Sequence, residues 1–345
     1  MVQFGGRAVG SGHPCYVIAE AGVNHDGSLE RALDLVEAAA QAGADAVKFQ
    51  LFTAEEVASQ LAPKADYQQA TTGAKQTQRA MLARLELPQK AFSALKASAD
   101  AAGVGFVCTC YSRAEIDYVV DLDVAALKFA SAQIVELPLL AHAAESGKPL
   151  LISTGMATLA ETADAVAATA GADVVVLQCT TSYPAPIGEA NIRAMGTLAA
   201  ALDVPVGFSD HTLDDAAAIV AVARGAAVVE KHLTHDRAAS GPDHRSSLEP
   251  PEFRDFVRKI RAAEAALGSP AKEPAPSERP NLAVMRRSLF ATTDIPAGTT
   301  ISDKHVGLRR PDIGLPPRFL PHVIGATARE DIAAGTPLSL HELLW

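Results

Sequence analysis

The stretch AAVVEKHLTHD, residues 226–236, begins like a buried strand and ends in charged and polar side chains. A second stretch, VGFSDH at 206–211, has the same form and ends with Ser209 and His211. Short apolar, β-branched runs are typical of parallel sheets whose two faces are both covered. The polar ends indicate that neighbouring strands deliver functional groups to one edge of such a sheet.

Eight apolar runs of this kind occur, at 16–22, 46–50, 104–109, 126–131, 150–154, 174–180, 206–211 and 228–234. Ala-rich segments with helical periodicity separate them, as in the segment that Ser28 caps and Gly43 ends. Eight strands alternating with helices over about 250 residues predict an α/β fold, a (β/α)₈ TIM barrel. A doubly wound open sheet is the alternative, and the lack of a G-x-G-x-x-G turn after any strand favours the barrel.

The chain divides into three parts by composition. Residues 1–268 carry the predicted barrel, and within them the polar segment 51–90 exceeds a normal βα loop, which predicts an active-site lid. Residues 269–283 are proline-rich and indicate a stiff linker. Residues 284–345 contain the echo DIPAGTTIS and DIAAGTPLS, which predicts a small, mostly β module with pseudo-repeated halves.

Composition excludes several classes of partner. The chain has 345 residues and a net charge of −10, so it offers no basic excess for nucleic acid. No apolar run approaches membrane-spanning length, and the N-terminus has no apolar secretory core. Four cysteines are too few and too irregular for a disulfide framework, which favours free thiols in a reducing cytoplasm. We therefore expect a cytoplasmic protein without a nucleic-acid or membrane partner.

In a barrel, the carboxyl ends of all strands point to one face, and active sites lie there. The polar residues at these predicted ends are Glu20, Lys48, Gln50, Thr109, Lys128, Ser131, Ser153, Thr154, Thr180, Thr181, Tyr183, Ser209, His211, Glu230 and His232. Two lysines surrounded by hydroxyls suit phosphate and carboxylate groups.

The two histidines take matching positions on adjacent predicted strands. His211 and His232 could reach one ion, and two imidazoles plus carboxylate or water suit Mn²⁺, Fe²⁺, Co²⁺ or Zn²⁺. The alternative is a structural role for each histidine, and their pairing favours the metal. Glu20 is a candidate general acid/base or sugar-hydroxyl clamp. The residues alone thus predict a metal-assisted enzyme that acts on an anionic substrate.

Motifs along nearly the whole chain carry a family resemblance. They are AEAGVNHDGS (19–28), AVKFQ (46–50), LKFAS (127–131), LISTGM (151–156), CTTSYPAP (179–186), GFSDHT (207–212), EKHLT (230–234) and GPDHRSSLEP (241–250). By these motifs the chain resembles the sialic acid (N-acetylneuraminate) synthases, including the legionaminic and pseudaminic acid synthases. Its C-terminal part resembles their antifreeze-like (SAF) domain. The resemblance implies a transferase that condenses phosphoenolpyruvate with N-acetylmannosamine or a related N-acyl amino sugar, giving a nonulosonic acid and phosphate by C–O cleavage.

The resemblance also implies roles for the site residues. The phosphate and carboxylate of phosphoenolpyruvate would be held by Lys48, Thr109, Lys128, Ser131, Ser153 and Ser209. His211 and His232 would bind a divalent metal, Mn²⁺ first and Mg²⁺ or Co²⁺ as alternatives. The sugar or reacting centre would be lined by Glu20, Gln50, Gln133, Thr181, Tyr183 and Asp243. Arg310 matches an arginine that reaches the partner subunit's sugar site, which implies a domain-swapped homodimer.

Two departures from the family pattern concern the sugar. Gln133 stands where members have a sugar-contacting glutamate, and a neutral amide cannot act as a base. Thr181 stands where several members have asparagine. Two alternatives therefore stay open: a legionaminic or pseudaminic acid synthase that uses a diacetamido hexose, and a non-catalytic sugar-binding barrel. An ice-binding role for the small domain is disfavoured, because that domain is tethered to a complete set of site residues.

Overall fold

The computed structural model describes residues 1–73 and 75–345. The chain folds as two compact units, Met1–Gly268 and Ser269–Trp345. Among the described residues, no helix combines the length and apolarity needed to cross a bilayer.

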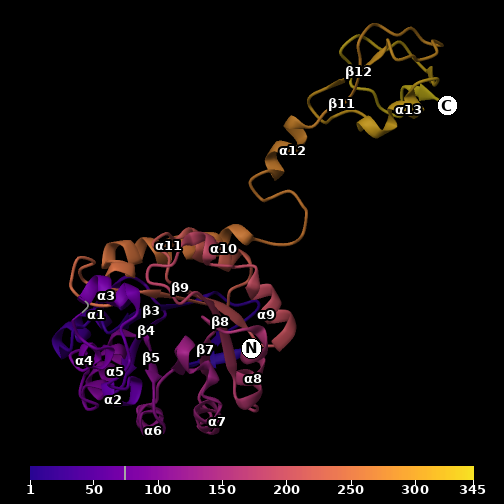
Figure 1. Ribbon diagram of the computed structural model, residues 1–345. Helices are drawn as coiled ribbons and strands as arrows, with labels where there is room; N and C mark the ends of the chain where they lie inside the picture. Colours follow the sequence, from indigo (N-terminus) through magenta and orange to yellow (C-terminus); the bar gives the residue numbers. More distant parts are fainter. Residues whose placement is uncertain (74) are drawn as a thin grey trace. The chain divides into compact units, whose positions relative to one another are not determined.

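Eight parallel strands form a closed barrel in the first unit (Figure 1), paired in the order β10-β3-β4-β5-β6-β7-β8-β9. The strands are β3 (Tyr16–Gly22), β4 (Ala46–Leu51), β5 (Gly105–Cys110), β6 (Ala126–Phe129), β7 (Leu150–Ser153), β8 (Val174–Cys179), β9 (Val206–Asp210) and β10 (Val228–His232). The last strand, β10, pairs with both β9 and β3 and so closes the barrel. The predicted TIM barrel is confirmed, and each predicted apolar run overlaps one barrel strand.

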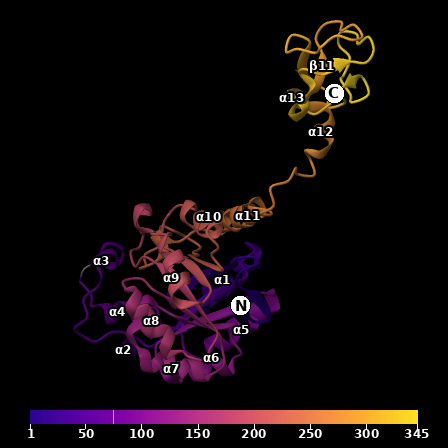
Figure 2. The ribbon, with the colours of Figure 1, turned by 90° about the vertical axis from the view of Figure 1, so that its right-hand side faces the viewer.

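Helices surround the barrel, as Figures 1 and 2 show. They are α1 (Leu29–Gln41), α5 (Ala91–Ala102), α6 (Arg113–Asp121), α7 (Leu137–Glu145), α8 (Leu159–Ala168), α9 (Ala194–Leu202), α10 (Ala216–Ala223) and α11 (Pro250–Leu267). Ser28 caps α1 as predicted, since its hydroxyl accepts a hydrogen bond from the Arg31 backbone N–H at 3.3 Å. Gly43 follows the helix with φ +82°, a conformation that favours glycine.

A short N-terminal hairpin fills the barrel interior at the amino ends of the strands. It consists of β1 (Val2–Phe4) and β2 (Arg7–Val9), which pair antiparallel. Phe4 is buried with Ile18 and Val107, which point inward from their strands. Because this end is filled with apolar side chains, the interior is accessible for chemistry at the carboxyl ends.

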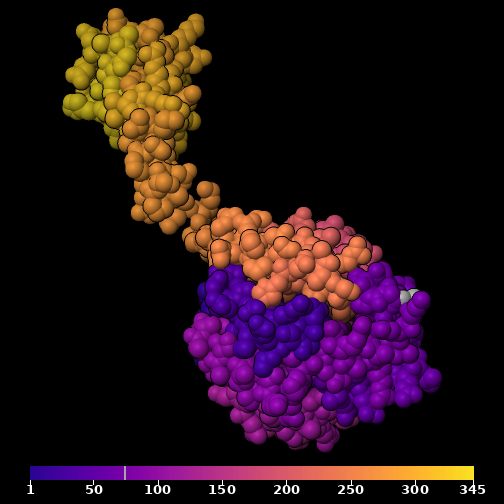
Figure 3. Space-filling view, turned by 90° about the vertical axis from the view of Figure 1, so that its left-hand side faces the viewer, coloured from indigo at the N-terminus to yellow at the C-terminus, as the bar shows by residue number. Residues whose placement is uncertain are grey.

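The last barrel helix ties the N-terminal segment to the barrel, and Figure 3 shows the face on which α11 (orange) meets that segment (indigo). Arg261 donates a hydrogen bond to the Cys15 carbonyl at 2.6 Å and pairs with Asp45 at 2.6 Å. Asp45 also pairs with Arg7 at 2.6 Å, so one carboxylate joins the hairpin, β3 and α11.

The predicted lid segment between β4 and α5 contains three short helices, α2 (Ala54–Val57), α3 (Asp66–Thr72) and α4 (Gln78–Leu82). Ala74, within the predicted lid, lies outside the described residues. Lys64 holds the end of α3, donating to Thr72 Oγ1 and the Gly73 carbonyl, each at 2.9 Å. A Cβ on Gly27 would come within 2.6 Å of the Arg84 carbonyl oxygen, so the segment after α4 rests closely on the loop after β3.

The second unit is small and mostly β, as predicted. Its elements are α12 (Arg279–Met285), β11 (Ser288–Ala291), β12 (Val306–Arg309), α13 (Leu320–Val323), β13 (Thr327–Ala328) and β14 (Leu343–Leu344). The helix α12 begins inside the segment predicted as a linker, with Pro280 in its first turn, where proline is tolerated.

The two echoed segments of this unit pair with each other. Ile295 and Ile332 exchange backbone hydrogen bonds of 2.8 and 2.9 Å. Asp294 accepts from the Ala334 N–H at 2.8 Å, and Asp331 accepts from the Ala297 N–H at 2.7 Å. The predicted pseudo-repeat is therefore a reciprocal pairing of two similar halves.

Candidate active site

A cavity of about 250 Å³ lies at the carboxyl ends of the barrel strands. The barrel residues that line it include Glu20, Lys48, Gln50, Thr109, Lys128, Ser131, Ser153, Cys179, Tyr183, Ser209, His211, Glu230, His232 and Asp243. The lid segment adds Val57, Tyr67, Gln68, Gln78, Met81 and Leu82. A larger hollow of about 830 Å³ lies at the amino ends of the strands, but the buried charges gather in the smaller cavity.

Strand pleating explains why the apolar run of β10 ends in charges. Successive side chains of a strand point to opposite faces, so Glu230 and His232 enter the cavity while Lys231 points outward. Lys231 is fully buried and pairs with the equally buried Asp210 at 2.8 Å. One strand thus supplies two groups to the cavity and one half of a structural ion pair.

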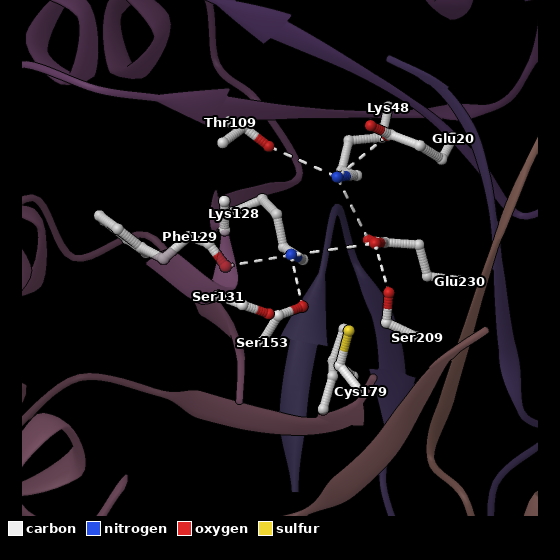
Figure 4. Close-up of polar contacts among 12 residues, drawn as sticks. Glu20, Lys48, Thr109, Lys128, Phe129, Ser131, Ser153, Cys179, Ser209 and Glu230 are labelled. Atoms are coloured by element: carbon white, nitrogen blue, oxygen red, sulfur yellow. Dashed lines mark hydrogen bonds and ion pairs between the residues drawn. The ribbon is translucent and has the colours of Figure 1, made fainter. Parts of the chain in front are cut away.

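Four buried charges meet in the cavity, and Figure 4 shows their arrangement. Lys48 Nζ lies 3.0 Å from Glu20 Oε2 and 3.4 Å from Glu230 Oε2. Lys128 Nζ lies 3.8 Å from Glu230 Oε1, which also accepts a hydrogen bond from Ser209 Oγ at 2.9 Å. Glu230 therefore lies between the two lysines and offsets part of their charge.

The pKa values separate these four groups. Burial would raise the pKa of Glu230, but Lys128 and Lys48 hold it at about 2. Burial would lower the pKa of Lys48, yet the carboxylates of Glu20 and Glu230 outweigh it and raise that pKa. Burial lowers the pKa of Lys128 to about 8, and burial raises the pKa of Glu20. Lys48 and Glu230 are thus charged at neutral pH, whereas Glu20 and Lys128 are the groups suited to exchange protons.

The hydroxyls predicted around the lysines are in place. Lys128 Nζ donates to Ser153 Oγ at 2.7 Å, and Lys48 Nζ donates to Thr109 Oγ1 at 3.4 Å. Ser131 Oγ accepts from the Gly155 N–H at 2.9 Å. Several strands therefore surround one small volume with cationic and neutral donors, which is the environment that a phosphate or carboxylate prefers.

The two histidines lie together at the cavity wall. The ring centroids of His211 and His232 are 5.4 Å apart, and the Tyr183 ring lies 4.1 Å from that of His211. His211 Nδ1 donates to the Thr180 carbonyl at 2.7 Å, so Nε2 carries the lone pair when this imidazole is neutral.

The histidine pair fits an open metal site. His232 Nδ1 is buried and has no hydrogen-bond partner among the described residues. Burial and the nearby His211 lower the pKa of His232 well below its usual range, so this imidazole is neutral, the form that binds metals. Within the described part of the chain, no group of three or more His, Cys, Asp or Glu side chains could hold a metal. Two imidazoles are one protein ligand fewer than catalytic metal sites usually have, so water and substrate oxygens would have to complete the shell of an ion held here.

Three of the residues that the family resemblance placed at the substrate lie outside this cavity, and so do the strand-end residues Thr154 and Thr180. Gln133 caps the turn after β6, donating to the Cys110 carbonyl at 2.8 Å and accepting from the Ala130 N–H at 2.9 Å. Thr181 lines a neighbouring hollow with Met156 and Asn191. Arg310 belongs to the second unit.

Three cavity residues, Glu230, Cys179 and Tyr67, carry no role that the sequence motifs assign. Glu230 was noted at its strand end, and its two-residue spacing from His232 could have placed both in the interior. Cys179 Sγ lies 3.8 Å from His211 Nδ1. Tyr67 of α3 packs against Tyr183, with ring centroids 4.9 Å apart and ring planes tilted by 34°. No pattern in the sequence points to Tyr67, because its neighbour lies on another loop more than a hundred residues away.

Comparisons with known proteins agree with this architecture. The NeuB family model matches residues 35–272, and the SAF domain model matches residues 286–344. The N,N'-diacetyllegionaminic acid synthase of Legionella pneumophila is 40% identical, over 95% of this chain and 94% of that protein. The synthase of the same name from Campylobacter jejuni is 41% identical, over 87% and 91%. The crystal structure of N-acetylneuraminic acid (sialic acid) synthetase from Leptospira borgpetersenii, in complex with citrate, matches with a TM-score of 0.72 and 32% identity, over 81% of this chain and 94% of that one.

Proposed function

Because this chain belongs to the NeuB family, we propose that it condenses phosphoenolpyruvate with an N-acyl amino sugar to give a nonulosonic acid and phosphate. The observation that carries the proposal is the pair of buried lysines, Lys48 and Lys128, among hydroxyls at the carboxyl ends of the barrel strands. Our first candidate sugar is the diacetamido hexose that gives N,N'-diacetyllegionaminic acid, because the relatives at 40% and 41% identity carry that name. N-acetylmannosamine is the second.

In this proposal, phosphoenolpyruvate binds near Lys128, with its anionic groups on the hydroxyls of Ser131 and Ser153. A substrate anion competes with Glu230 for both lysines and brings charge-assisted hydrogen bonds into a water-poor site. The anion also stabilises the charged form of Lys128, whose ammonium is otherwise weakened by burial.

His211 and His232 would hold the divalent metal, for which Mn²⁺ is our first candidate and Mg²⁺ and Co²⁺ are alternatives. When bound there, the ion would supply Lewis acidity to the aldehyde oxygen of the open-chain sugar. The fit rests on the free lone pair of His211 Nε2 and on the unpartnered Nδ1 of the neutral His232.

The proposed chemistry forms one carbon–carbon bond and exchanges one carbon–oxygen bond for another. The methylene carbon of phosphoenolpyruvate bonds to the aldehyde carbon, and the aldehyde oxygen becomes a hydroxyl. Water forms a bond to the neighbouring carbon, and phosphate leaves with the electrons of the old C–O bond. Of the two water protons, one ends on the new hydroxyl and the other on the phosphate. Glu20 is the group we assign to take the proton from that water, because burial raises its pKa. Gln50 Nε2 donates to Glu20 Oε1 at 2.9 Å and orients the carboxyl.

The first test is phosphate release from phosphoenolpyruvate with Mn²⁺, with and without chelator. The sugars are N-acetylmannosamine, its 6-phosphate, and the diacetamido sugars of the legionaminic and pseudaminic routes. We expect chelator-sensitive release with the legionaminic precursor, and label in the bridging oxygen of phosphoenolpyruvate should appear in the phosphate. Release with none of the sugars would favour the non-catalytic barrel. Gln133, on which that alternative rested, bonds to backbone outside the cavity and lends it no support.

We also propose that the active form is a homodimer in which Arg310 reaches the partner's cavity. The lining of the cavity, as far as the described residues define it, contains two lysines and no arginine. Inactive Arg310→Ala and Lys128→Ala proteins, unfolded and refolded together, should then regain activity, because each mixed dimer has one intact site. Random pairing predicts about a quarter of the wild-type rate. No recovery, with light scattering showing a monomer, would contradict the shared site.

A further inference from the structure

Two of the sequence motifs meet beside the cavity, and the proposed chemistry does not use the residues at which they meet. Asn24 and Asp26 belong to AEAGVNHDGS, in the loop after β3. His244 and Ser247 belong to GPDHRSSLEP, in the loop after β10. The motifs lie more than 200 residues apart, yet hydrogen bonds connect them directly.

His244 is fixed on both ring nitrogens. Its Nε2 donates to Asp26 Oδ1 at 3.1 Å, and its Nδ1 is hydrogen-bonded to Thr234 Oγ1 at 2.7 Å. The side chain is only 2% exposed. A Cβ on Gly241 would lie 2.5 Å from His244 Cδ2, so the backbone of the same loop packs directly against the ring.

The second connection holds the backbone carbonyl of Asp243 itself. Asn24 Nδ2 donates to Ser247 Oγ at 2.9 Å and to the Leu233 carbonyl at 2.9 Å. Ser247 Oγ in turn donates to the Asp243 carbonyl at 2.7 Å, and Ser246 Oγ donates to the same oxygen at 2.9 Å.

Asp243 itself points the other way, into the cavity. Its peptide neighbour His244 is held by Asp26, and its carbonyl is held through Ser247 by Asn24. Two adjacent points of the backbone, the carbonyl of this cavity residue and the residue that follows it, are therefore anchored to the loop of a neighbouring strand. A side chain placed by its own backbone moves with any displacement of that backbone, so these anchors decide where the carboxylate lies.

We propose that Asn24, Asp26, His244 and Ser247 form a loop clasp whose role is to position the Asp243 carboxylate against the amino sugar. The four are positioning residues, and they act through Asp243. This inference rests on the proposed function and assigns to the clasp the sugar half of the reaction. The phosphoenolpyruvate half depends on Lys48, Lys128 and the hydroxyls of other strands, which the clasp does not touch.

The test is a double-mutant cycle read separately for each substrate. In His244→Gln, we expect kcat/KM for the sugar to fall about tenfold or more, because one buried hydrogen bond and its geometry are lost. The KM for phosphoenolpyruvate should stay within about twofold. In an Asp243→Asn background the same substitution should change kcat/KM for the sugar by less than about twofold, because its effect passes through Asp243.

Asp26→Asn is the second variant, since it keeps a hydrogen-bond partner for His244 and removes only the charge. It should give a smaller loss of the same kind. Arg261→Gln is the matched control: it breaks a comparable long-range ion pair, with Asp45, at the other end of the barrel. We expect it to reduce stability without changing the ratio of the two substrates' kinetic constants.

Two results would overturn the clasp: equal losses for both substrates in His244→Gln, or multiplicative losses in the double variant. Hydrogen–deuterium exchange of residues 241–250 separates this inference from the proposed function. If the wild type turns over no sugar, the proposed function fails. The clasp is then judged by exchange, which must rise in His244→Gln and not in Arg261→Gln; unchanged exchange would refute it.

Discussion

Lys128 sets the pH range in which the cavity can hold an anion. Burial lowers its pKa to about 8, and the Glu230 carboxylate keeps it from falling further. Since only the charged ammonium attracts an anion, we expect the KM for phosphoenolpyruvate to rise as pH increases through about 8. Glu230→Gln removes the opposing carboxylate, so the rise should begin at lower pH. Steady-state kinetics over roughly pH 6–10 measure both curves.

The control for this prediction is Glu161→Gln, which removes an exposed carboxylate at the start of α8. Its pH profile should coincide with that of the wild type. A Glu230→Gln profile that also coincides, or that moves to higher pH, would contradict the role given to Glu230.

His211 provides a prediction about the metal. Replacing His211 with alanine removes one of the two imidazoles, and substitution even of an outer-shell partner commonly costs 10- to 100-fold, so we expect activity to fall at least about 100-fold. The content of Mn²⁺, measured by mass spectrometry after dialysis, should fall in parallel. Gln133→Ala is the comparison, since Gln133 bonds only to backbone outside the cavity. A His211→Ala protein that keeps either metal or activity would refute the assignment.

At the scale of elements, the segment predicted to be a lid meets the loop after β3 in a close approach at Gly27. Gly27 has φ +76°, and a Cβ there would lie 2.6 Å from the Arg84 carbonyl oxygen. Gly27→Ala should therefore destabilise the protein by about 1–3 kcal/mol and raise the KM for the sugar, because the displaced lid carries Tyr67. Gly6→Ala is the matched control: its φ is +86°, but nothing lies within 4 Å.

Urea unfolding and sugar kinetics distinguish the two glycine variants. Both variants lose stability because alanine disfavours a positive φ. The difference between their free energies of unfolding therefore reports the contact with Arg84. If both variants lose the same stability and neither changes the KM, the lid does not depend on this contact.

The same elements show what sequence can predict. The barrel strands could be predicted because strands such as β3 and β8 are apolar on both faces. Such strands are stable only in a sheet that is covered on both sides. The lid helices were missed because α2 and α4 have four and five residues, too few for helical periodicity to show. The N-terminal hairpin was missed for the same reason, since β1 and β2 have three residues each.

The candidate site divides in the same way. Residues on strands were brought together because barrel geometry fixes where a strand ends, as with Lys48 and Lys128. Residues on loops can be placed only by tertiary contacts. Gln133 was therefore predicted to line the cavity, whereas its side chain bonds to backbone outside it. Tyr67 was not predicted, although it packs against Tyr183 in the cavity. Asp243 lies on a loop and was still placed, because the family resemblance supplied what geometry could not.

At the scale of the whole molecule, the two units have separate apolar cores. The barrel core includes Phe92 and Phe256, whereas Leu289, Ile301 and Leu338 belong to the core of the second unit. We therefore expect residues 1–268 to fold alone, with the circular dichroism and metal content of the barrel in the full chain. This fragment should not turn over the sugar, because it lacks Arg310. Calorimetry should show one of the transitions of the full chain retained. If this fragment does not fold, or if it is fully active, the two units do not have the separate roles expected here.

Closure of the barrel has a consequence for the synthesis of the protein on the ribosome. The strand β3 pairs with β10, which follows it by about 210 residues. At synthesis rates of about 5–20 residues per second, roughly 10–40 s pass between the emergence of the two strands. Throughout that interval the nascent chain carries a hydrophobic edge without its neighbour, a template for pairing with other chains. Slow translation near the end of the barrel would lengthen this exposure, so the yield of soluble protein should respond to codon choice before residue 232 and to the supply of chaperones that bind nascent chains.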